Sequence, residues 1–369
     1  MERKNGTLDI IETKIELEEI LDDFEKKYTG VKVKRVDDPK HRFLLQFYFQ
    51  FDREGGVLKT PTYTVVKDSV TPYYDLKRIL KIVEHTYLSE KEEYYHRIPI
   101  AASCKDYAEI VKRELEKDIS HNCWKPKLVV FQVDHNPASD AYIRGKKKDC
   151  EEVGIDFELV EIDSEKVDQV DFYKMIQKYK YHSESTPWGM IIQLPIPEKY
   201  DLDHLVSGIA HGADVDGFRK DSYYKPCTPA GIINWLKYNK VILAGKDICV
   251  VGRSEIVGKP LVNMLIDAGA TVTCCNSRTA YLSKHTADAD IVVTAIGKPK
   301  FFNETYFSKK TSLIIDVGIN RDENGRLCGD VDAERVRKQY PGVYITPVPG
   351  GVGLLTRVQL LENVVGGDK

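Results

Sequence analysis

Two side chains that could transfer a proton lie one helical turn apart in the first half of the chain. Tyr142 and Lys146 are four residues apart in the run NPASDAYIRGKKKDCEEVGI, which predicts a helix. Residues at this spacing lie on one face of a helix. A lysine held near a phenol and away from water can have a lowered pKa and act in proton transfer. Lys146 also begins a run of three lysines, and such runs usually face solvent, so the spacing leaves both interpretations open.

Three further segments place polar or flexible residues where a ligand could bind. Gln193 ends the apolar run of a predicted strand, where ligands approach an open α/β sheet, although a buried amide often pairs with backbone instead. Asp216 precedes a glycine in ADVDGF, a pattern that by itself indicates a turn. In TPVPGGVG, Thr346–Gly353, two prolines fix the backbone and three glycines let it approach something flat or large.

The pattern strand, glycine turn, helix, strand occupies Lys246–Thr279. The apolar run DICVV ends at Gly252, a run with helical spacing begins at Gly258, and TVTCC follows. In such a βαβ unit the N–H groups of the turn and the positive end of the helix face a pyrophosphate, which predicts dinucleotide binding. The two glycines are six residues apart, so the usual G-x-G-x-x-G spacing is absent.

The end of the second strand of this unit favours NADP over NAD. It reads NSRT and lacks the acidic residue that commonly binds a ribose hydroxyl. Arg278 and two hydroxyls suit a 2′-phosphate, and Arg253 in the glycine turn could add a second cation. The alternative is that both arginines are solvated surface charges.

Length and composition limit the class of protein. A chain of 369 residues is too long for one compact core and predicts two or three domains. Hydrophobic and charged contents of 42% and 30% are typical of soluble globular proteins, and there is no apolar run of membrane-spanning length. The net charge of -3 gives no general reason to bind nucleic acid, and the N-terminus lacks the apolar core of a signal peptide. We therefore expect a cytoplasmic protein with no membrane partner.

The eight cysteines include no C-x-x-C pair, so neither a disulfide framework nor a metal site is expected.

Residues 1–96 form a predicted α+β module of unknown role. The sequence predicts a helix over 8–28, strands over 43–51 and 62–66, and a helix over 74–87. Its tyrosines and lysines could stack on single-stranded nucleic acid, but aromatic strands are more often core, and we expect no nucleic-acid partner.

From residue 97 onward, helices and strands alternate, which predicts an α/β fold with parallel sheets. The expected division is a first α/β lobe over 97–227, a Rossmann-like lobe over 228–345, and a glycine-rich loop with a final helix over 346–369 that returns to the first lobe. The expected helices are 105–119, one through 150, 167–179, 228–239, one from 258, and 356–365, and the expected strands are 127–133, 156–162, 189–194, 247–252, 271–275, 290–297, 312–320 and 342–348. A crevice between two such lobes is where a cofactor meets a substrate.

The motifs of this region, taken in order, resemble the methylenetetrahydrofolate dehydrogenase/cyclohydrolase family. The segments that carry the resemblance are NPASDAYIRGKKKDCEEVGI, GMIIQLPIP, DVDGF, PCTPAGI, VVGRSEIVGKP, TVTCCNSRT, ADIVVTAIGKP, IIDVGIN, GDVD and TPVPGGVG. The resemblance extends over roughly residues 100–367 and does not include the first 96 or so. It implies a homodimeric, two-lobed enzyme of one-carbon metabolism. Such an enzyme oxidises 5,10-methylenetetrahydrofolate with NADP and hydrolyses the methenyl product to 10-formyltetrahydrofolate.

The resemblance also implies a role for individual residues. Lys146 corresponds to the cyclohydrolase general acid/base, Tyr142 stacks on or orients the folate, Gln193 positions Lys146, and Asp216 binds the pterin edge. The implied cofactor-binding residues are Gly252, Arg253, Ser254, Ile256, Ser277, Arg278, Thr279 and Ile319. The implied substrate-binding residues are Tyr142, Lys146, Gln193, Asp216, Pro349, Gly350 and Gly351, with the glycine-rich loop continuing to Gly353.

Four departures from the family pattern lie near the expected folate pocket. They are Ala213 in place of a lysine, Asp134 in place of a glycine, Leu354-Leu355 in place of proline-methionine, and a short segment over 218–225. Two alternatives therefore stay open: a member with dehydrogenase activity alone, and a regulatory protein that binds NADP or folate without turnover. Retention of both Tyr142 and Lys146 argues against each of them.

Overall fold

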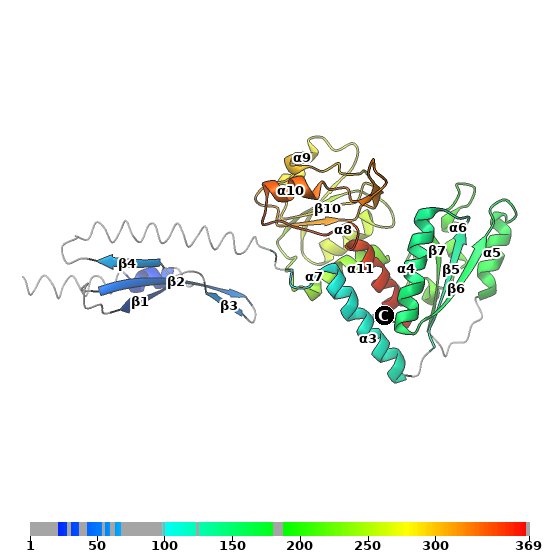
Figure 1. Cartoon of the computed structure of the whole chain (residues 1–369), viewed down its shortest axis with the longest axis horizontal. Helices are drawn as coiled ribbons and strands as arrows, with labels where there is room; N and C mark the ends of the chain where they lie inside the picture. Colours follow the sequence, from blue (N-terminus) through cyan, green and yellow to red (C-terminus); the bar gives the residue numbers. More distant parts are fainter. Residues whose placement is uncertain are drawn as a thin grey trace, which may run out of the picture. The chain divides into compact units, whose positions relative to one another are not determined.

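The chain divides into two compact units, Met1–Arg97 and Ile98–Lys369, in the computed structural model (Figure 1). The residues that the structure describes are 21–27, 31–36, 43–53, 56–59, 63–67, 98, 100–122, 125–179 and 187–366. Within these ranges, no helix is long and apolar enough to cross a membrane.

The described part of the first unit contains a helical segment, residues 21–27, and an antiparallel sheet of four strands. The strands are β1 (Val31–Val36), β2 (Phe43–Arg53), β3 (Gly56–Lys59) and β4 (Tyr63–Lys67). β2 pairs with each of the other three. The sequence-based count of two strands is therefore wrong, although VKVKRV in β1 has the alternation of period two that a strand shows. The helix expected over 74–87 lies outside the described residues.

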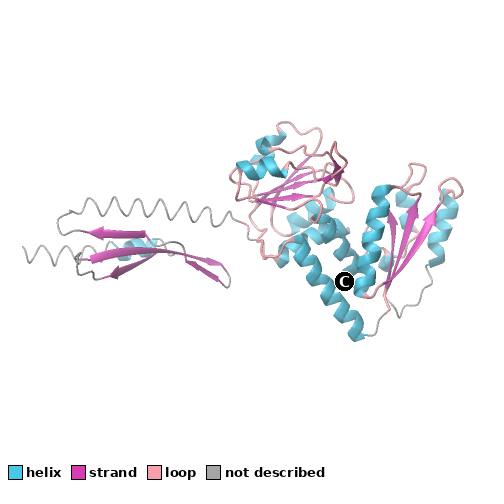
Figure 2. Ribbon diagram, in the orientation of Figure 1, coloured by secondary structure: helices cyan, strands magenta, loops and turns pink. Residues whose placement is uncertain are grey.

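The second unit begins with a lobe whose three strands form a parallel sheet in the order β6-β5-β7 (Figure 2). The strands are β5 (Lys127–Val133), β6 (Asp156–Ile162) and β7 (Trp188–Gln193), and the helices between and after them are α4 (Pro137–Val153), α5 (Gln169–Lys178) and α6 (Leu202–Ser207). β5 is central and six of its seven residues are buried, which explains its apolar run Leu128–Phe131.

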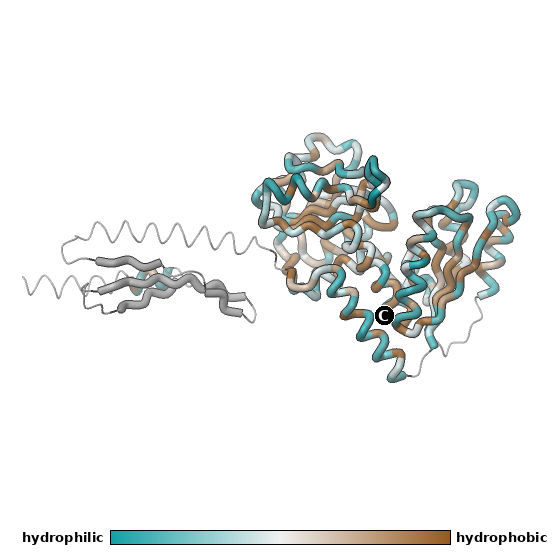
Figure 3. The backbone as a smooth tube through the Cα atoms, in the orientation of Figure 1, coloured by the Kyte–Doolittle hydropathy of each residue, from teal (hydrophilic) through white to brown (hydrophobic). Residues whose placement is uncertain are grey.

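The following lobe contains a parallel sheet of five strands in the order β14-β11-β10-β8-β9, which confirms the Rossmann-like prediction. The strands are β8 (Asp247–Val251), β9 (Thr271–Cys275), β10 (Ile291–Thr294), β11 (Leu313–Asp316) and β14 (Tyr344–Ile345), and the helices are α8 (Gly258–Asp267), α9 (Leu282–Ala287) and α10 (Ala333–Gln339). The central strands are the most hydrophobic parts of the lobe (Figure 3). A small hairpin of β12 (Asn320–Arg321) and β13 (Leu327–Cys328) was not expected.

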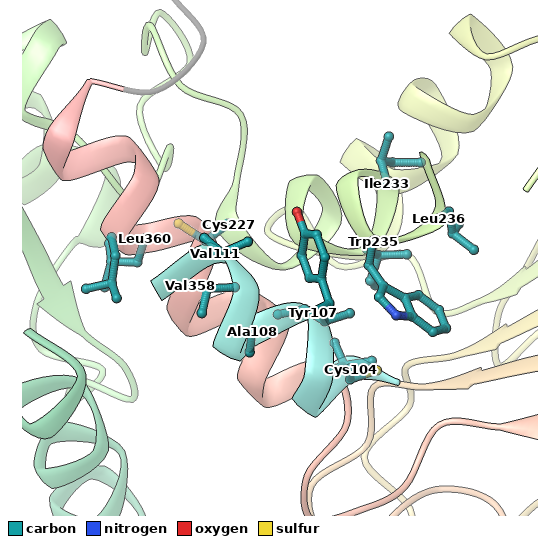
Figure 4. Close-up of a cluster of buried hydrophobic side chains, with 14 of the residues drawn as sticks. Cys104, Tyr107, Ala108, Val111, Cys227, Ile233, Trp235, Leu236, Val358 and Leu360 are labelled. Atoms are coloured by element: carbon teal, nitrogen blue, oxygen red, sulfur yellow. The ribbon is translucent and has the colours of Figure 1, made fainter. Parts of the chain in front are cut away.

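Three helices pack together between the two sheets: α3 (Cys104–Asn122), α7 (Cys227–Tyr238) and α11 (Val352–Val365). Their apolar faces share one core, in which Trp235 is fully buried (Figure 4). The indole Nε1 of Trp235 donates to the carbonyl oxygen of Ala102 at 2.9 Å, so its polar atom is also satisfied. α11 contacts α4 and β7 as well, and it therefore connects the glycine-rich loop to the lobe of the β6-β5-β7 sheet.

Candidate active site

Lys146 is a buried lysine on α4. The helix begins at a proline after Asn136, whose side chain accepts from Ser139 N at 2.9 Å, and it ends at Gly154 in the left-handed conformation. This placement turns Lys146 inward, with only 6% of the residue exposed, whereas the neighbouring Lys147 and Lys148 are exposed. The solvent-facing interpretation of the lysine run is therefore wrong for its first member.

Gln193 and Asp216 form the surroundings of the Lys146 ammonium. Lys146 Nζ donates to Gln193 Oε1 at 2.9 Å, and Gln193 Nε2 donates to the carbonyl oxygen of Leu194 at 2.8 Å, which fixes the orientation of the amide. Burial lowers the pKa of Lys146, while the charge of Asp216 acts in the opposite direction. Burial likewise raises the pKa of Asp216, against the effect of Lys146. Both groups are thus displaced toward their neutral forms, the condition in which a proton can move between a side chain and a ligand.

The turn after Asp216 explains its glycine. Gly217 has a φ of 72°, and a Cβ at this position would lie 2.6 Å from the backbone carbon of Lys225. Asp214 is buried at 1% exposure and accepts from Arg219 N at 2.8 Å. Of Asp214 and Asp216, Asp214 is therefore the one whose carboxylate stabilises the turn. The ADVDGF pattern is therefore a turn, as expected, and it also places one carboxylate beside Lys146.

A pocket of about 230 Å³ lies beside Tyr142. Its lining residues are Ala141, Tyr142, Asp316, Val317, Gly318, Ile319, Leu327, Pro347 to Leu354, and Arg357. Five of the residues singled out from the sequence thus line one pocket, namely Tyr142, Ile319, Pro349, Gly350 and Gly351. Lys146, Gln193 and Asp216 are not among its lining residues and form a separate hydrogen-bonded and electrostatic cluster.

The glycine-rich loop lies close to Tyr142. A Cβ on Gly353 would lie 3.1 Å from the Tyr142 hydroxyl oxygen, and one on Gly351 would overlap the carbonyl oxygen of Pro347. Gly350 has a φ of 96°, in the region that favours glycine. Burial raises the pKa of Tyr142, so its phenol is neutral at physiological pH.

Of the departures from the family pattern, only Leu354 lines this pocket. Ala213 is buried among the apolar residues packed around β7, Leu355 is fully buried in the core of α11, and Asp134 is exposed. Ala213 and Asp134 therefore do not line the pocket beside Tyr142, and whether they lie near the bound folate stays a prediction.

The glycine turn after β8 has the backbone crossing that its unusual spacing requires. Gly252 has a φ of 134°, and a Cβ on Gly258 would overlap the carbonyl oxygen of Gly252. Ser254 Oγ accepts from the N–H groups of Val257 at 3.2 Å and Gly258 at 3.3 Å, which orders the turn before α8. Two glycines six residues apart are therefore needed because the start of α8 passes directly over the end of β8.

The two arginines predicted to bind a phosphate lie at the carboxyl ends of adjacent strands, β8 and β9. Arg253, Ser277 and Arg278 are exposed there, and Ile256 is half-buried in the turn. Asn276 Oδ1 accepts from Arg278 N, and Thr279 Oγ1 accepts from Asn276 N, each at 2.9 Å. Cations, hydroxyls and the glycine turn before α8 thus occupy one edge of the sheet, and this set fits a dinucleotide with a 2′-phosphate.

Two buried aspartates had no individual role in the sequence-based expectations. Asp330 accepts from the backbone N–H groups of Ile296, Gly297 and Lys298 and from Asn320 Nδ2, at 2.7 to 3.2 Å. Asp316 accepts from the backbone N–H groups of Gly318, Asp330 and Val331. Burial raises the pKa of Asp316 to about 6. The only sign of Asp316 and Asp330 in the sequence is that they lie in IIDVGIN and GDVD, two of the segments that carry the family resemblance.

Arg357 is a further residue that the sequence did not single out. It lies in the C-terminal helix, lines the pocket, and pairs with Asp149 of α4. Among the described residues, no cluster of three or more histidine, cysteine or acidic side chains could hold a metal ion.

Two family models match this chain. The tetrahydrofolate dehydrogenase/cyclohydrolase catalytic domain matches residues 102–216, and the NAD(P)-binding domain of the same family matches residues 226–369. Both matches lie in the second compact unit.

Similar proteins include the bifunctional protein FolD of Bacillus licheniformis, 41% identical over 253 residues that make up 66% of this chain and 87% of the relative. The FolD of Nitrosomonas europaea is 40% identical over 258 residues, 68% of this chain and 85% of that protein. The crystal structure of the FolD methylenetetrahydrofolate dehydrogenase/cyclohydrolase from Campylobacter jejuni is 36% identical with a TM-score of 0.66, covering 71% of this chain and 96% of that one. The Trypanosoma brucei enzyme, solved with NADP and an inhibitor, is 27% identical with a TM-score of 0.65, covering 71% and 94%. The chain therefore belongs to the tetrahydrofolate dehydrogenase/cyclohydrolase family.

Proposed function

We propose that this protein is a bifunctional, NADP-dependent enzyme of one-carbon metabolism. It oxidises 5,10-methylenetetrahydrofolate to 5,10-methenyltetrahydrofolate and hydrolyses this product to 10-formyltetrahydrofolate. The observation that carries the proposal is the buried Lys146, bonded to Gln193 and coupled electrostatically to Asp216, one turn of α4 from the pocket residue Tyr142. The bifunctional relatives support it.

The two lobes bind different ligands in this proposal. In the proposed division, residues 97–227 bind the folate, residues 228–345 bind NADP, and residues 346–369 contribute the glycine-rich loop and the final helix. NADP supplies the hydride acceptor when it is bound. Gly252, Ser254 and Ile256 of the turn would face its pyrophosphate, and the cationic edge of Arg253, Arg278 and the hydroxyls of Ser277 and Thr279 would select its 2′-phosphate.

Hydride transfer requires the one-carbon bridge of the folate to be held in one orientation. Tyr142 offers an aromatic face in the pocket, which Ile319, Pro349, Gly350 and Gly351 also line. A wall of apolar side chains and glycine backbone excludes water from the region where the hydride moves and lets a planar ring approach closely.

Hydrolysis requires a water molecule to add to the cationic amidinium carbon while a proton is accepted. Neutral Lys146 can accept that proton, because burial lowers its pKa, and can return it to the ring nitrogen that leaves as the ring opens. Gln193 holds the amine at 2.9 Å, and Asp216 accepts hydrogen bonds from the adjacent donors of the pterin edge. The same lysine thus serves as base and then as acid.

The test follows NADPH and the methenyl intermediate separately during turnover of 5,10-methylenetetrahydrofolate with NADP. For wild type we expect NADPH without accumulation of methenyl. Lys146→Ala is expected to abolish hydrolysis and to let methenyl accumulate while some hydride transfer continues, because only the proton transfer is removed. Lys148→Ala, an exposed position on the same helix, is the matched control and should behave as wild type. Hydrolysis that survives in Lys146→Ala would refute the assigned role, and a wild type without NADPH formation would refute the enzyme itself.

The resemblance to the family further supports a cytoplasmic homodimer as the working form. Light scattering of the purified full chain measures the mass in solution, and a monomeric mass would contradict the dimer.

A further inference from the structure

Arg357 brings a positive charge into the pocket beside Tyr142. It extends from α11 toward α4, where its Nε lies 2.9 Å from Asp149 Oδ2. The Nε–H does not point at this oxygen and has no hydrogen-bond acceptor among the described residues, so the contact is an ion pair rather than a directed hydrogen bond. The side chain remains 23% exposed, through the pocket that it lines.

The neighbouring part of α4 leaves space for this guanidinium. A Cβ on Gly145 would overlap Arg357 Nη1, so any other residue at this position would displace the guanidinium. Glycine within a helix is less favourable than alanine. The glycine at position 145 of α4 thus leaves the space that the Arg357 guanidinium occupies.

Charge balance at Asp149 leaves the guanidinium available to a ligand. The Asp149 side chain is 6% exposed and lies 2.9 Å from Arg357 and 4.0 Å from Lys112, so it has two cationic neighbours. Lys112 also pairs with Glu109 at 2.9 Å and Glu152 at 3.0 Å. Asp149 therefore holds the Nε side of Arg357 in place, and the terminal nitrogens lie against Gly145 and the pocket.

We propose that Arg357 is a substrate-binding residue that recognises the oxygen acceptors of the aminobenzoyl-glutamate arm of the folate. This inference rests on the proposed function. Five N–H donors and no acceptor restrict a guanidinium to oxygen-bearing partners, and carboxylates are bound best because the fork matches their geometry. The pterin edge presents adjacent donors, which suit Asp216 and would be repelled by Arg357. The arm carries a benzoyl carbonyl and glutamate carboxylates, so it is the part of the substrate that fits the cation.

The experiment measures the KM for 5,10-methylenetetrahydrofolate and for NADP, together with the Kd for tetrahydrofolate by calorimetry, in the full chain. For Arg357→Met we expect the folate KM and the tetrahydrofolate Kd to rise about tenfold or more, because a hydrogen bond to a charged group is lost. The NADP KM should change much less. Arg144→Met, which removes an exposed arginine of α4, is the control and should match wild type.

Asp149→Asn/Arg357→Met separates binding from stability. The single Arg357→Met variant leaves a buried carboxylate with one fewer cation and should lower the melting temperature. The double variant should recover much of that loss and keep the raised folate KM. Recovery of the folate KM in the double variant would show that the pair is only structural and would overturn the inference. Gly145→Ala should raise the folate KM in wild type and have little further effect in Arg357→Met, because both changes act on the same guanidinium.

Further outcomes tell a failure of this inference from a failure of the proposed function, and show which oxygen of the substrate Arg357 contacts. If wild type turns over the folate and Arg357→Met has the wild-type KM and Kd, the inference fails and the proposed function stands. If wild type neither binds tetrahydrofolate nor forms NADPH, both fail. If Arg357→Met no longer raises the folate KM when the substrate lacks its glutamate, Arg357 contacts a glutamate carboxylate. If the KM is still raised, Arg357 contacts the benzoyl carbonyl. Either result supports the binding role of Arg357.

Discussion

Replacing Gln193 with glutamate would place a negative charge against the Lys146 ammonium. The amide oxygen of Gln193 already lies 2.9 Å from Lys146 Nζ, so a carboxylate oxygen can occupy the same position without moving the lysine. Burial lowers the pKa of Lys146 in the native protein, so the neutral amine is accessible and activity that uses it as a base is present above that pKa. A carboxylate in contact favours the charged form, and Gln193→Glu is therefore expected to raise the pKa of Lys146.

The structure sets the size of this effect. A hydrogen bond that gains charge on its acceptor is worth about 1.5 to 3 kcal/mol, and each pH unit corresponds to about 1.4 kcal/mol. The acid limb of the cyclohydrolase profile should therefore move to higher pH by about one to two units. Below the new limb Lys146 is protonated and cannot accept the proton from water, so hydrolysis at neutral pH should fall by about tenfold or more.

The assay is the pH dependence of kcat/KM for hydrolysis of supplied methenyltetrahydrofolate, without NADP. Gln193→Leu is the matched control, because it also loses the donor to Leu194 O but adds no charge. Its acid limb should not move to higher pH. If Gln193→Glu has the same limb as Gln193→Leu, Lys146 does not titrate in the rate-determining proton transfer, and the role assigned to the Lys146–Gln193 pair would be refuted.

Two other predictions concern the cofactor lobe. Asp330→Asn replaces one of two carboxylate oxygens that together accept four hydrogen bonds, so two bonds to a charged group should be lost. The free energy of unfolding, measured by urea titration, should fall by about 3 to 6 kcal/mol. The control Glu323→Gln, on the exposed turn of the β12–β13 hairpin, should leave it unchanged. A loss below about 1 kcal/mol for Asp330→Asn would contradict this account of its hydrogen bonds. Arg253→Ala should raise the KM for NADP about tenfold or more and leave the KM for NAD nearly unchanged, because only NADP carries the 2′-phosphate; equal effects on the two KM values would remove the phosphate assignment.

The parallel strands could be predicted from the sequence because their physical cause is local. A strand buried on both faces needs a short run of β-branched and other apolar residues, and β5 and β8 have such runs ended by glycine or polar residues. The short helices α6, α9 and α10 were not predicted. Helices of six or seven residues complete less than two full turns, and this is too few for a period of 3.6 to be visible.

The site was predictable to a smaller extent, because its chemistry depends on contacts between distant segments. Helical spacing placed Tyr142 and Lys146 on one face, but only the folded structure shows that Lys146 is buried and bonded to Gln193 at the end of β7. The partnership of Arg357 with Asp149 has no local signal at all, since the two residues lie on different helices and the glycine that makes room for the guanidinium has no φ that demands glycine.

The buried aspartates of the cofactor lobe connect the two halves of the proposed reaction. Asp316 lines the pocket beside Tyr142 and accepts from Asp330 N, and the Asp330 carboxylate in turn holds the backbone over 296–298 at the end of β10. This segment follows a central strand of the cofactor sheet, at the edge where a dinucleotide lies in such folds. A network with every acceptor satisfied inside the protein is rigid, because each bond is strong in a low dielectric and a broken one leaves a buried charge unpaired. In the proposed function, these buried hydrogen bonds connect the pocket beside Tyr142 to the carboxyl edge of the cofactor sheet and would hold the folate and NADP at a fixed separation.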